Sequence, residues 1–366
     1  MAILGTLAAN IWVFAMSSDG TGPLKTVLDP LTNGKFFAML AMMFGVGLAV
    51  QYRTAAAYGR RWPGRYRWRQ VLLLAEGALH TLLLFAWDVL MGYAVTGLVV
   101  IWLLRRSERV RTAVMWSALA VNTLLFGGMT LVYVALTPQR SGSGGHEEWK
   151  ALFLNGGYLE QVAMRWEDFL GTRSEAIASF PMLLFLFLLG VRLYRAGVFD
   201  DDQRGQRYRK LMTRCGLGLG LPLCVLGSHI SYLGELHRYG FSIVLMLGYV
   251  GLAGWLLDRT RSRGQVPRSL SAVGRTALTC YVLQNLLGSV IFYGWGFGLA
   301  SYLDTGDVGG LALEGWVLGA ALVIALALVI GARSWLRRFD RGPLEAAGAR
   351  LVSLVPEHFP RRVGRG

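Results

Sequence analysis

Residues 311–332 read LALEGWVLGAALVIALALVIGA, an apolar run in which Glu314 is the only charged residue. A helix that spans a bilayer needs roughly 17–25 such residues. Nine further apolar segments precede this run, near 2–17, 35–51, 70–86, 89–104, 111–136, 177–194, 211–233, 239–257 and 272–300. The sequence therefore predicts an all-α, polytopic membrane bundle of about ten helices, with residues 1–366 forming a single transmembrane domain.

The composition excludes an ordinary soluble protein. Of the 366 residues, 54% are hydrophobic and 16% are charged, whereas soluble domains average roughly 45–50% and about 25%. There are three cysteines, Cys215, Cys224 and Cys280, and no CxxC motif. An odd number at such spacings favours neither a disulfide framework nor a zinc site, and we expect no metal.

The net charge of +15 is distributed unevenly along the chain. Basic clusters occupy every second connection between spans, and acids dominate the alternate ones. The basic connections are 51–69, 105–111, 192–214, 259–275 and the tail 333–366, and the acids include Asp19, Asp29, Glu147, Glu148, Glu160, Glu167, Asp168, Glu175, Asp304 and Asp307. By the positive-inside rule, both termini are expected in the cytoplasm, with a bacterial plasma membrane as the expected location and membrane lipids as partners. No nucleic-acid motif accompanies the charge.

The longest acidic connection, 138–176, has two parts. Residues 138–145 are rich in Gly and Ser and are expected to be flexible. The remainder alternates apolar and acidic residues, which indicates an amphipathic segment at the outer membrane interface. An interfacial anchor is the favoured role, and a lid over an outward-facing site is the alternative.

Two ionisable residues occur deep in the third segment. His80 lies about ten residues, or roughly 15 Å, from the cytoplasmic end. Glu76 precedes it by one helical turn, on the same face. A carboxylate there could orient the imidazole and stabilise its charged form. The alternative is a neutral, hydrogen-bonded His80 beside a protonated Glu76. Intramembrane ionisable residues are functional candidates, so both interpretations stay open.

Asp88 begins the fourth segment on the outer side. Along a straight helix it would lie about 12 Å from His80, too far for contact. Capping of the following helix is the favoured role. Binding of an acceptor substrate at the outer mouth is the alternative.

The ninth segment contains more polar residues than a lipid-facing helix would carry, so much of it is expected to face the bundle interior. Its polar residues are Thr279, Tyr281, Gln284 and Asn285, which could simply join helices together. The first three are also candidates to bind a cofactor. Arg275 could meet a phosphate or serve as a positive-inside anchor. Asn10 in the first segment and His229 near the outer surface are further candidates for substrate binding.

Glycines recur within several apolar runs. The groups Gly45–Gly47, Gly216–Gly220 and Gly294–Gly298 lack the strand–turn–helix context of a nucleotide-binding loop. Close packing between helices is the expected explanation.

Five short motifs, in register over nearly the whole chain, resemble one family. They are Met1–Ile11; Gly34–Phe37 with Phe44–Gly47; Gly77–His80 with Asp88–Ala94; Gly274–Tyr281; and Arg341–Glu345. This is the YeiB-like membrane protein family, catalogued as domain of unknown function 418. That family is similar to the transmembrane acyltransferases, which include acyltransferase family 3 and the lysosomal heparan N-acetyltransferase.

The resemblance implies a bundle of approximately ten helices that uses cytoplasmic acyl-CoA, with a histidine, here His80, acting on the acyl group or the acceptor. Two departures are noted. The Asp-x-x-Arg-Gly stretch that usually precedes the first motif is absent, which predicts a start site placed too late or a shortened N-terminus. Cys280 and Asn285 stand where Asn and a small hydroxyl residue are expected.

Two functions follow as hypotheses. The first is an acyltransferase that moves an acyl group, expected to be acetyl, from acyl-CoA to a hydroxyl or amine of a sugar, envelope lipid or secreted metabolite. His80 would act as base or acyl carrier and Glu76 would orient it, with Arg275 and arginines of 51–69 on the CoA phosphates. The second is a small-molecule or proton-coupled transporter with Glu76 and His80 as a proton relay. A non-catalytic scaffold is a third possibility, and a homo-oligomer is compatible with each.

Overall fold

The computed structural model describes residues 1–16, 22–136, 144–260, 264–304 and 310–355. Most of the stretch expected to be flexible, the end of the basic tail, Asp19 and Asp307 lie outside these ranges. The described residues form helices and no strand, so the predicted all-α class is confirmed.

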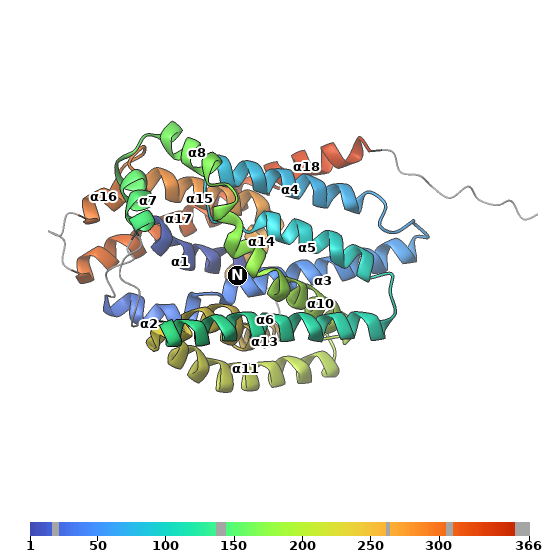
Figure 1. Ribbon diagram of the computed structural model, residues 1–366. Coiled ribbons are helices and arrows are strands. Elements are labelled where there is room, and N and C mark those ends of the chain that lie inside the picture. Colours follow the sequence, from blue (N-terminus) through green and yellow to red (C-terminus); the bar gives the residue numbers. More distant parts are fainter. Residues whose placement is uncertain (17–21, 137–143, 261–263, 305–309, 356–366) are drawn as a thin grey trace, which may run out of the picture.

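The helices follow the apolar segments, with short connecting helices between them (Figure 1). Their bounds are α1 Ala2–Phe14, α2 Pro23–Thr32, α3 Lys35–Ala57, α4 Tyr66–Leu83, α5 Leu90–Leu103, α6 Glu108–Leu136, α7 Gly144–Asn155, α8 Tyr158–Glu167, η2 Gly171–Arg173, α9 Ser174–Ala178, α10 Phe180–Arg195, α11 Gln203–His229, η3 Ser231–Leu233, α12 Gly234–Leu236, the π-helix η4 His237–Phe241, α13 Ser242–Thr260, α14 Gln265–Arg275, α15 Ala277–Phe292, α16 Leu299–Asp304, α17 Gly310–Trp335 and α18 Pro343–Ser353.

Among the described residues, five helical stretches are long and apolar enough to cross a membrane, or six if the bent pair Gly171–Ala178 and Phe180–Arg195 is one span. The five are Pro23–Ala57, Glu108–Ala135, Gln203–His229, Ser231–Arg259 and Gly310–Trp335. Three shorter apolar helices, α1, α5 and α15, accompany them. The chain is thus a helical membrane protein by length and composition, and the count of about ten spans stays a prediction.

The ninth predicted segment, 272–300, is not one continuous helix. α14 ends at Arg275, and α15 begins after a break at Thr276. At the other end, Gly298 has φ +65°, and Phe297 N donates to Val290 O at 2.7 Å, so the chain folds back on α15. The glycines at 294–298 therefore form a turn rather than a helical stretch. Close packing against a helix is still found at Gly294, where a Cβ would lie 2.3 Å from Leu154 O of α7.

The other two glycine groups do allow close helix packing. A Cβ on Gly45 of α3 would lie 2.0 Å from Phe187 O of α10, and one on Gly216 of α11 would lie 2.2 Å from Gly248 N of α13. Side chains larger than hydrogen have no room at these crossings. The prediction is confirmed at Gly45 and Gly216, whereas Gly47 and Gly218 have open space around the Cβ position.

The long helices run side by side, so that most connections gather at the two ends of the bundle (Figure 1). The connections α3–α4, α5–α6 and α10–α11 lie at one end, together with α18. The short helices α7, α8 and α16 lie at the opposite end. The arginine-rich connections α3–α4, α5–α6 and α10–α11 therefore lie at the end opposite α7 and α16.

Candidate functional site

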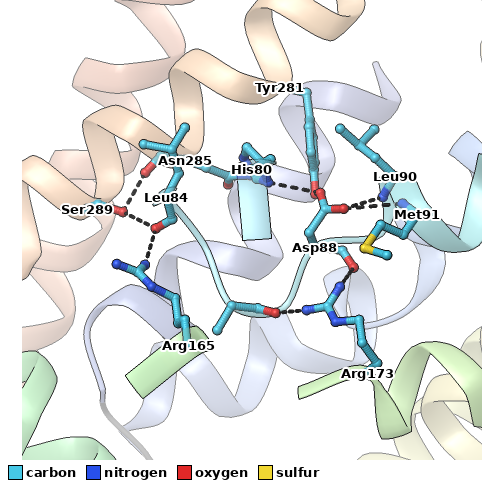
Figure 2. A network of polar contacts seen from close by, with 11 residues as sticks. His80, Leu84, Asp88, Leu90, Met91, Arg165, Arg173, Tyr281, Asn285 and Ser289 are labelled. Atoms are coloured by element: carbon cyan, nitrogen blue, oxygen red, sulfur yellow. Dashed lines mark hydrogen bonds and ion pairs between the residues drawn. The ribbon is translucent and has the colours of Figure 1, made fainter. Parts of the chain in front are cut away.

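His80 and Asp88 form a buried polar contact where α4 ends and α5 begins (Figure 2). Nδ1 of His80 lies 2.9 Å from Oδ1 of Asp88, and the two side chains are 2% and 0% exposed. The atoms are within ion-pair distance, although the ring N–H is not aligned as in a hydrogen bond. Such a contact orients an imidazole and stabilises its charged form.

The backbone explains how the two residues meet. α4 ends at Leu83, and the amides of Leu84 and Phe85 both donate to His80 O, so the chain turns back at the level of the histidine. The expectation that Asp88 lies too far from His80 is wrong, because it assumed a helix that continues straight. This turn of residues 84–89 carries Asp88 to the imidazole.

Glu76 is not the partner of His80 in this structure. In the part of the chain described, the imidazole contacts Asp88 and Asn285. Glu76 lies toward α18, where a Cβ on Gly348 would be 3.7 Å from its Oε1. Residues one helical turn apart share a face, but His80 lies at the helix end and turns toward α15 and the turn, while Glu76 faces the C-terminal helix.

Asp88 also caps α5, the role favoured from sequence. Its Oδ2 accepts from Leu90 N at 2.8 Å and from Met91 N at 3.3 Å, which satisfies amides that lack partners at a helix start. Its Oδ1 accepts from the Tyr281 hydroxyl at 3.2 Å. The carboxylate is therefore fixed by the backbone on one side while it faces His80 and Tyr281 on the other.

α15 supplies the remaining wall around His80. Tyr281, Gln284 and Asn285 are buried and lie on one helical face. Nδ2 of Asn285 is 3.1 Å from Nε2 of His80. With the amide donating there, the ring proton is on Nδ1, toward Asp88. This is the tautomer that leaves Nε2 as the basic atom.

Two buried acceptors on this face of α15 have no hydrogen-bond partner among the described residues. They are Oε1 of Gln284 and Oδ1 of Asn285. Buried polar atoms are normally paired, so unpaired ones call for an explanation such as an absent ligand. The Gln284 amide donates to Thr6 Oγ1 at 3.2 Å, and Thr6 lines a cavity.

That cavity has a volume of about 740 Å³, within the size range of small-molecule sites. Tyr281 forms part of its wall, so one side chain separates it from Asp88. Aromatic and polar side chains share the lining, among them Asn10, Trp12, Asp29, Phe85, Trp87, Trp149, Asp168 and Glu175. Asp88 itself lines a smaller adjoining cavity of about 30 Å³.

Residues 149–175, hereafter the cover segment, form much of that wall. Trp149, Lys150 and Phe153 come from α7, and Asp168, Gly171, Thr172 and Glu175 follow α8. Phe153 and Gln161 are fully buried, which an interfacial anchor would not require. Leu159, Trp166 and Leu170 of the same segment are exposed by 77%, 70% and 78%, as an interfacial anchor would require, so the anchor and the lid both stay predictions.

Two of the residues predicted to bind a cofactor gather elsewhere. Thr279 donates through Oγ1 to Glu345 Oε2 at 2.6 Å, and the amides of Leu278 and Thr279 donate to Glu345 Oε1 at 2.8 and 3.3 Å. Arg275 is exposed and donates to Asp340 O at 2.8 Å. Glu345 thus caps α15 from α18, and neither Arg275 nor Thr279 contacts His80.

The predicted substrate-binding residues also separate. Asn10 and Asp88 lie in the walls of the two adjoining cavities. His229 is exposed at the end of α11, where Nδ1 lies 2.8 Å from Val225 O, and it lines neither of these cavities. No group of His, Cys, Asp and Glu suited to a metal ion occurs within the described residues.

Two arginines that sequence reasoning missed hold the turn of residues 84–89. Arg165 of α8 donates to Leu84 O at 2.9 Å, and Arg173 of η2 donates to Asp88 O at 3.0 Å and also to Ala86 O. The sequence does distinguish these two residues by their positive charge, because Lys and Arg are scarce in the acidic connection 138–176. Ser289 Oγ donates to Leu84 O as well, at 3.1 Å.

A second buried polar cluster lies beyond the cavity wall. Nζ of Lys35 is 2.6 Å from Nε2 of His237, and both side chains are buried. Nδ1 of His237 is 3.8 Å from Oδ2 of Asp29, which lines the cavity. His237 begins the π-helix η4, a distortion frequent at functional sites.

Comparison with known proteins confirms the resemblance seen in the motifs. The family described as "Protein of unknown function (DUF418)" matches residues 193–354. The chain is 27% identical to the uncharacterized protein YeiB of Escherichia coli, over 94% of this chain and 92% of that protein. It is 28% identical to the uncharacterized protein YxaH of Bacillus subtilis, over 94% and 90%. No solved structure matches the chain significantly.

Proposed function

We propose that the protein is an integral membrane acyltransferase in which His80, oriented by Asp88, is the base. One observation carries the proposal: Asp88 faces Nδ1 of a buried imidazole whose Nε2 accepts from Asn285, next to a cavity of about 740 Å³. A general base needs an orienting acid on one nitrogen and, on the other, a lone pair that the acceptor can reach once the Asn285 amide is displaced.

The reaction follows from that arrangement. An acceptor hydroxyl or amine displaces the Asn285 amide and gives its proton to Nε2 while it attacks the thioester carbon of acyl-CoA. The C–S bond breaks, and the CoA thiolate takes the proton back from the imidazolium, which Asp88 stabilises. The displaced Asn285 amide becomes available to donate to the carbonyl oxygen, where charge develops. In the variant with a covalent carrier, Nε2 attacks the thioester carbon, the C–S bond breaks and CoA leaves as the thiolate. The acceptor then attacks the acyl-imidazole, the N–C bond breaks, and the thiolate takes the acceptor's proton.

The donor and the acceptor approach from opposite ends of the bundle in this proposal. Acyl-CoA, expected to be acetyl-CoA, enters from the end with the arginine-rich connections, which the positive-inside rule assigns to the cytoplasm. Arg275 is exposed at the start of α15 and supplies a charge for the CoA phosphates. The acceptor occupies the cavity under the cover segment.

Acetyl-CoA binding to the purified protein in detergent tests this proposal. We expect saturable binding by the wild type, weaker binding by Arg275→Ala, and retained binding without thiol release by His80→Ala. The proposal is wrong if the wild type does not bind acetyl-CoA, or if folded His80→Ala still releases CoA.

Proton-coupled transport is the second candidate, and one observation favours it. The buried residues His237 and Lys35, together with Asp29, whose side chain is 34% exposed in the cavity wall, form a chain of ionisable groups that begins at the cavity, as proton relays in transporters do. It replaces the Glu76–His80 relay, whose members do not meet. Proton uptake by proteoliposomes under an imposed membrane potential, lost in Lys35→Met and kept in His80→Ala, would support transport over acyl transfer.

A further inference from the structure

The turn of residues 84–89 is held from outside by two guanidinium groups. The accepting carbonyls belong to alternate residues, Leu84, Ala86 and Asp88, and each accepts from Arg165 or Arg173 (Figure 2). The last of these carbonyls belongs to the residue that faces His80. A displacement of either arginine therefore moves the backbone that carries the catalytic carboxylate.

These arginines are unusual as structural residues. Arg165 and Arg173 are 1% and 5% exposed. Neither forms an ion pair within the described ranges of the chain. Burial lowers the pKa of the Arg165 guanidinium, because loss of water disfavours the charged form. An apolar side chain in place of either arginine would leave the turn carbonyls that it binds without a donor, so the guanidinium groups hold the backbone of the turn.

Both arginines come from the cover segment. The Arg165 guanidinium lies 5.9 Å from the ring centre of Phe153, which lines the cavity, and Arg173 follows directly after the cavity residues Gly171 and Thr172. Nη2 of Arg165 and Nε of Arg173 are buried donors without a partner in the described part of the chain. The two arginines therefore do not use all of their hydrogen-bond donors. The Asp88–His80 contact likewise has the distance of a hydrogen bond but not its alignment.

We propose that Arg165 and Arg173 are positioning residues that set Asp88 against His80 and connect the cover segment of the cavity to the reacting imidazole. The inference rests on the proposed function. The planar guanidinium of Arg173 holds two carbonyls of the turn at once, which a lysine ammonium does not reproduce. Displacement of a catalytic group by about 1 Å costs on the order of 100-fold in rate.

The imidazole tautomer supplies a readout that does not depend on activity. The protein contains five histidines, so ¹⁵N-histidine labelling gives few signals, and His80→Asn identifies those of His80. We expect the wild type to carry the proton on Nδ1. We expect a shift of the population toward Nε2–H in three variants, Asp88→Asn, Arg173→Met and Arg173→Lys. Arg173→Lys should show this shift although it keeps the positive charge.

Arg209→Met is the matched control. Arg209 is also buried and also donates to two turn carbonyls, Val198 O and Asp200 O, but it lies on α11 and pairs with Asp258. Its loss destabilises the protein and leaves the His80 signals unchanged. If Arg173→Met does not fold, Arg173→Lys decides the matter alone.

Kinetics then separate positioning from general damage. Arg173→Lys should lower kcat roughly 100-fold with little change in the KM for acyl-CoA. In a protein that already carries Asp88→Asn, Arg173→Lys should lower kcat no further, because Arg173 acts through Asp88. Unchanged His80 signals in folded Arg173→Lys, or additive effects of the two changes, would overturn the inference. A wild type without acyl transfer contradicts the proposed function instead, and the His80 signals still decide the positioning role.

Discussion

The two oxygens of the Asp88 carboxylate have different partners, because one faces His80 and the other caps the start of α5. Oδ1 lies 2.9 Å from Nδ1 of His80, and Oδ2 accepts from the amides of Leu90 and Met91. The cap fixes the rotation of the carboxylate, because both amides approach the same oxygen. Asp88 therefore caps the helix and orients the imidazole at the same time. Substitutions that keep only one of these roles can separate the two effects.

Asp88→Ala should destabilise the protein by about 1 kcal/mol more than Asp88→Asn does. Asparagine accepts from helix amides nearly as well as aspartate, whereas alanine leaves them unpaired. Unfolding in detergent, followed by circular dichroism, measures the difference. Equal stability of the two variants would show that the cap contributes nothing.

Gly77→Ala should disturb the same carboxylate sterically. A Cβ there would lie 2.7 Å from Met91 N and 3.0 Å from Asp88 Oδ2. We expect lower thermal stability and loss of transfer. Gly47→Ala is the matched control, because nothing lies within 4 Å of its Cβ position and alanine is the better helix former by about 1 kcal/mol. Equal tolerance of both changes would argue against close packing at Gly77.

Tyr281→Phe should reduce the transfer rate about tenfold while leaving the fold intact. The variant loses one hydrogen bond to a carboxylate, worth about 1.5 kcal/mol. Tyr293→Phe is the control, since the Tyr293 hydroxyl is buried and has no hydrogen-bond partner within the described residues. Initial rates of CoA release compare the two. A loss in both variants would point to general packing rather than to Asp88.

Glu345→Ala should release α18 from the start of α15. The change removes three hydrogen bonds, from Leu278 N, Thr279 N and Thr279 Oγ1, and with them a helix cap worth about 1 kcal/mol. Limited proteolysis by chymotrypsin, which cleaves after apolar residues such as Leu344 and Leu351 and does not need Arg350, should cut within residues 343–353 faster than in wild type. Arg350→Gln, on the exposed side of α18, should be cut at the wild-type rate. Unaltered cleavage of Glu345→Ala would contradict the capping role.

Periodicity and hydropathy predicted where the helices form, because a long apolar run favours a helix. Within the described residues, only five of the helical stretches, or six with the bent pair, are long and apolar enough to cross a membrane. These patterns could not place the breaks inside 272–300 or the turn at residues 84–89. Both depend on contacts between distant segments, such as Glu345 with α15 and Arg173 with the turn. A straight-helix estimate therefore excluded Asp88 and favoured Glu76, although both residues were named as candidates.

The residues of the candidate site could likewise be predicted from the sequence only in part. His80, Tyr281, Gln284 and Asn285 stood out as polar residues at membrane depth, and the structure gathers them. Arg165 and Arg173 did not, because a charged residue in an outer connection is ordinarily solvated. Their burial depends on the cover segment folding back over the cavity, which no local pattern encodes.

In the proposed reaction Asp88, and not Glu76, supports His80 as the base in acyl transfer. This assignment can be tested by the release of CoA from acetyl-CoA, measured for wild type, Asp88→Asn and Glu76→Gln at equal amounts of folded protein. We expect a rate at least 100-fold lower for Asp88→Asn, by analogy with the loss of an orienting acid, and a rate close to wild type for Glu76→Gln. A loss of CoA release in Glu76→Gln, with release retained in Asp88→Asn, would show that Glu76 supports His80 instead.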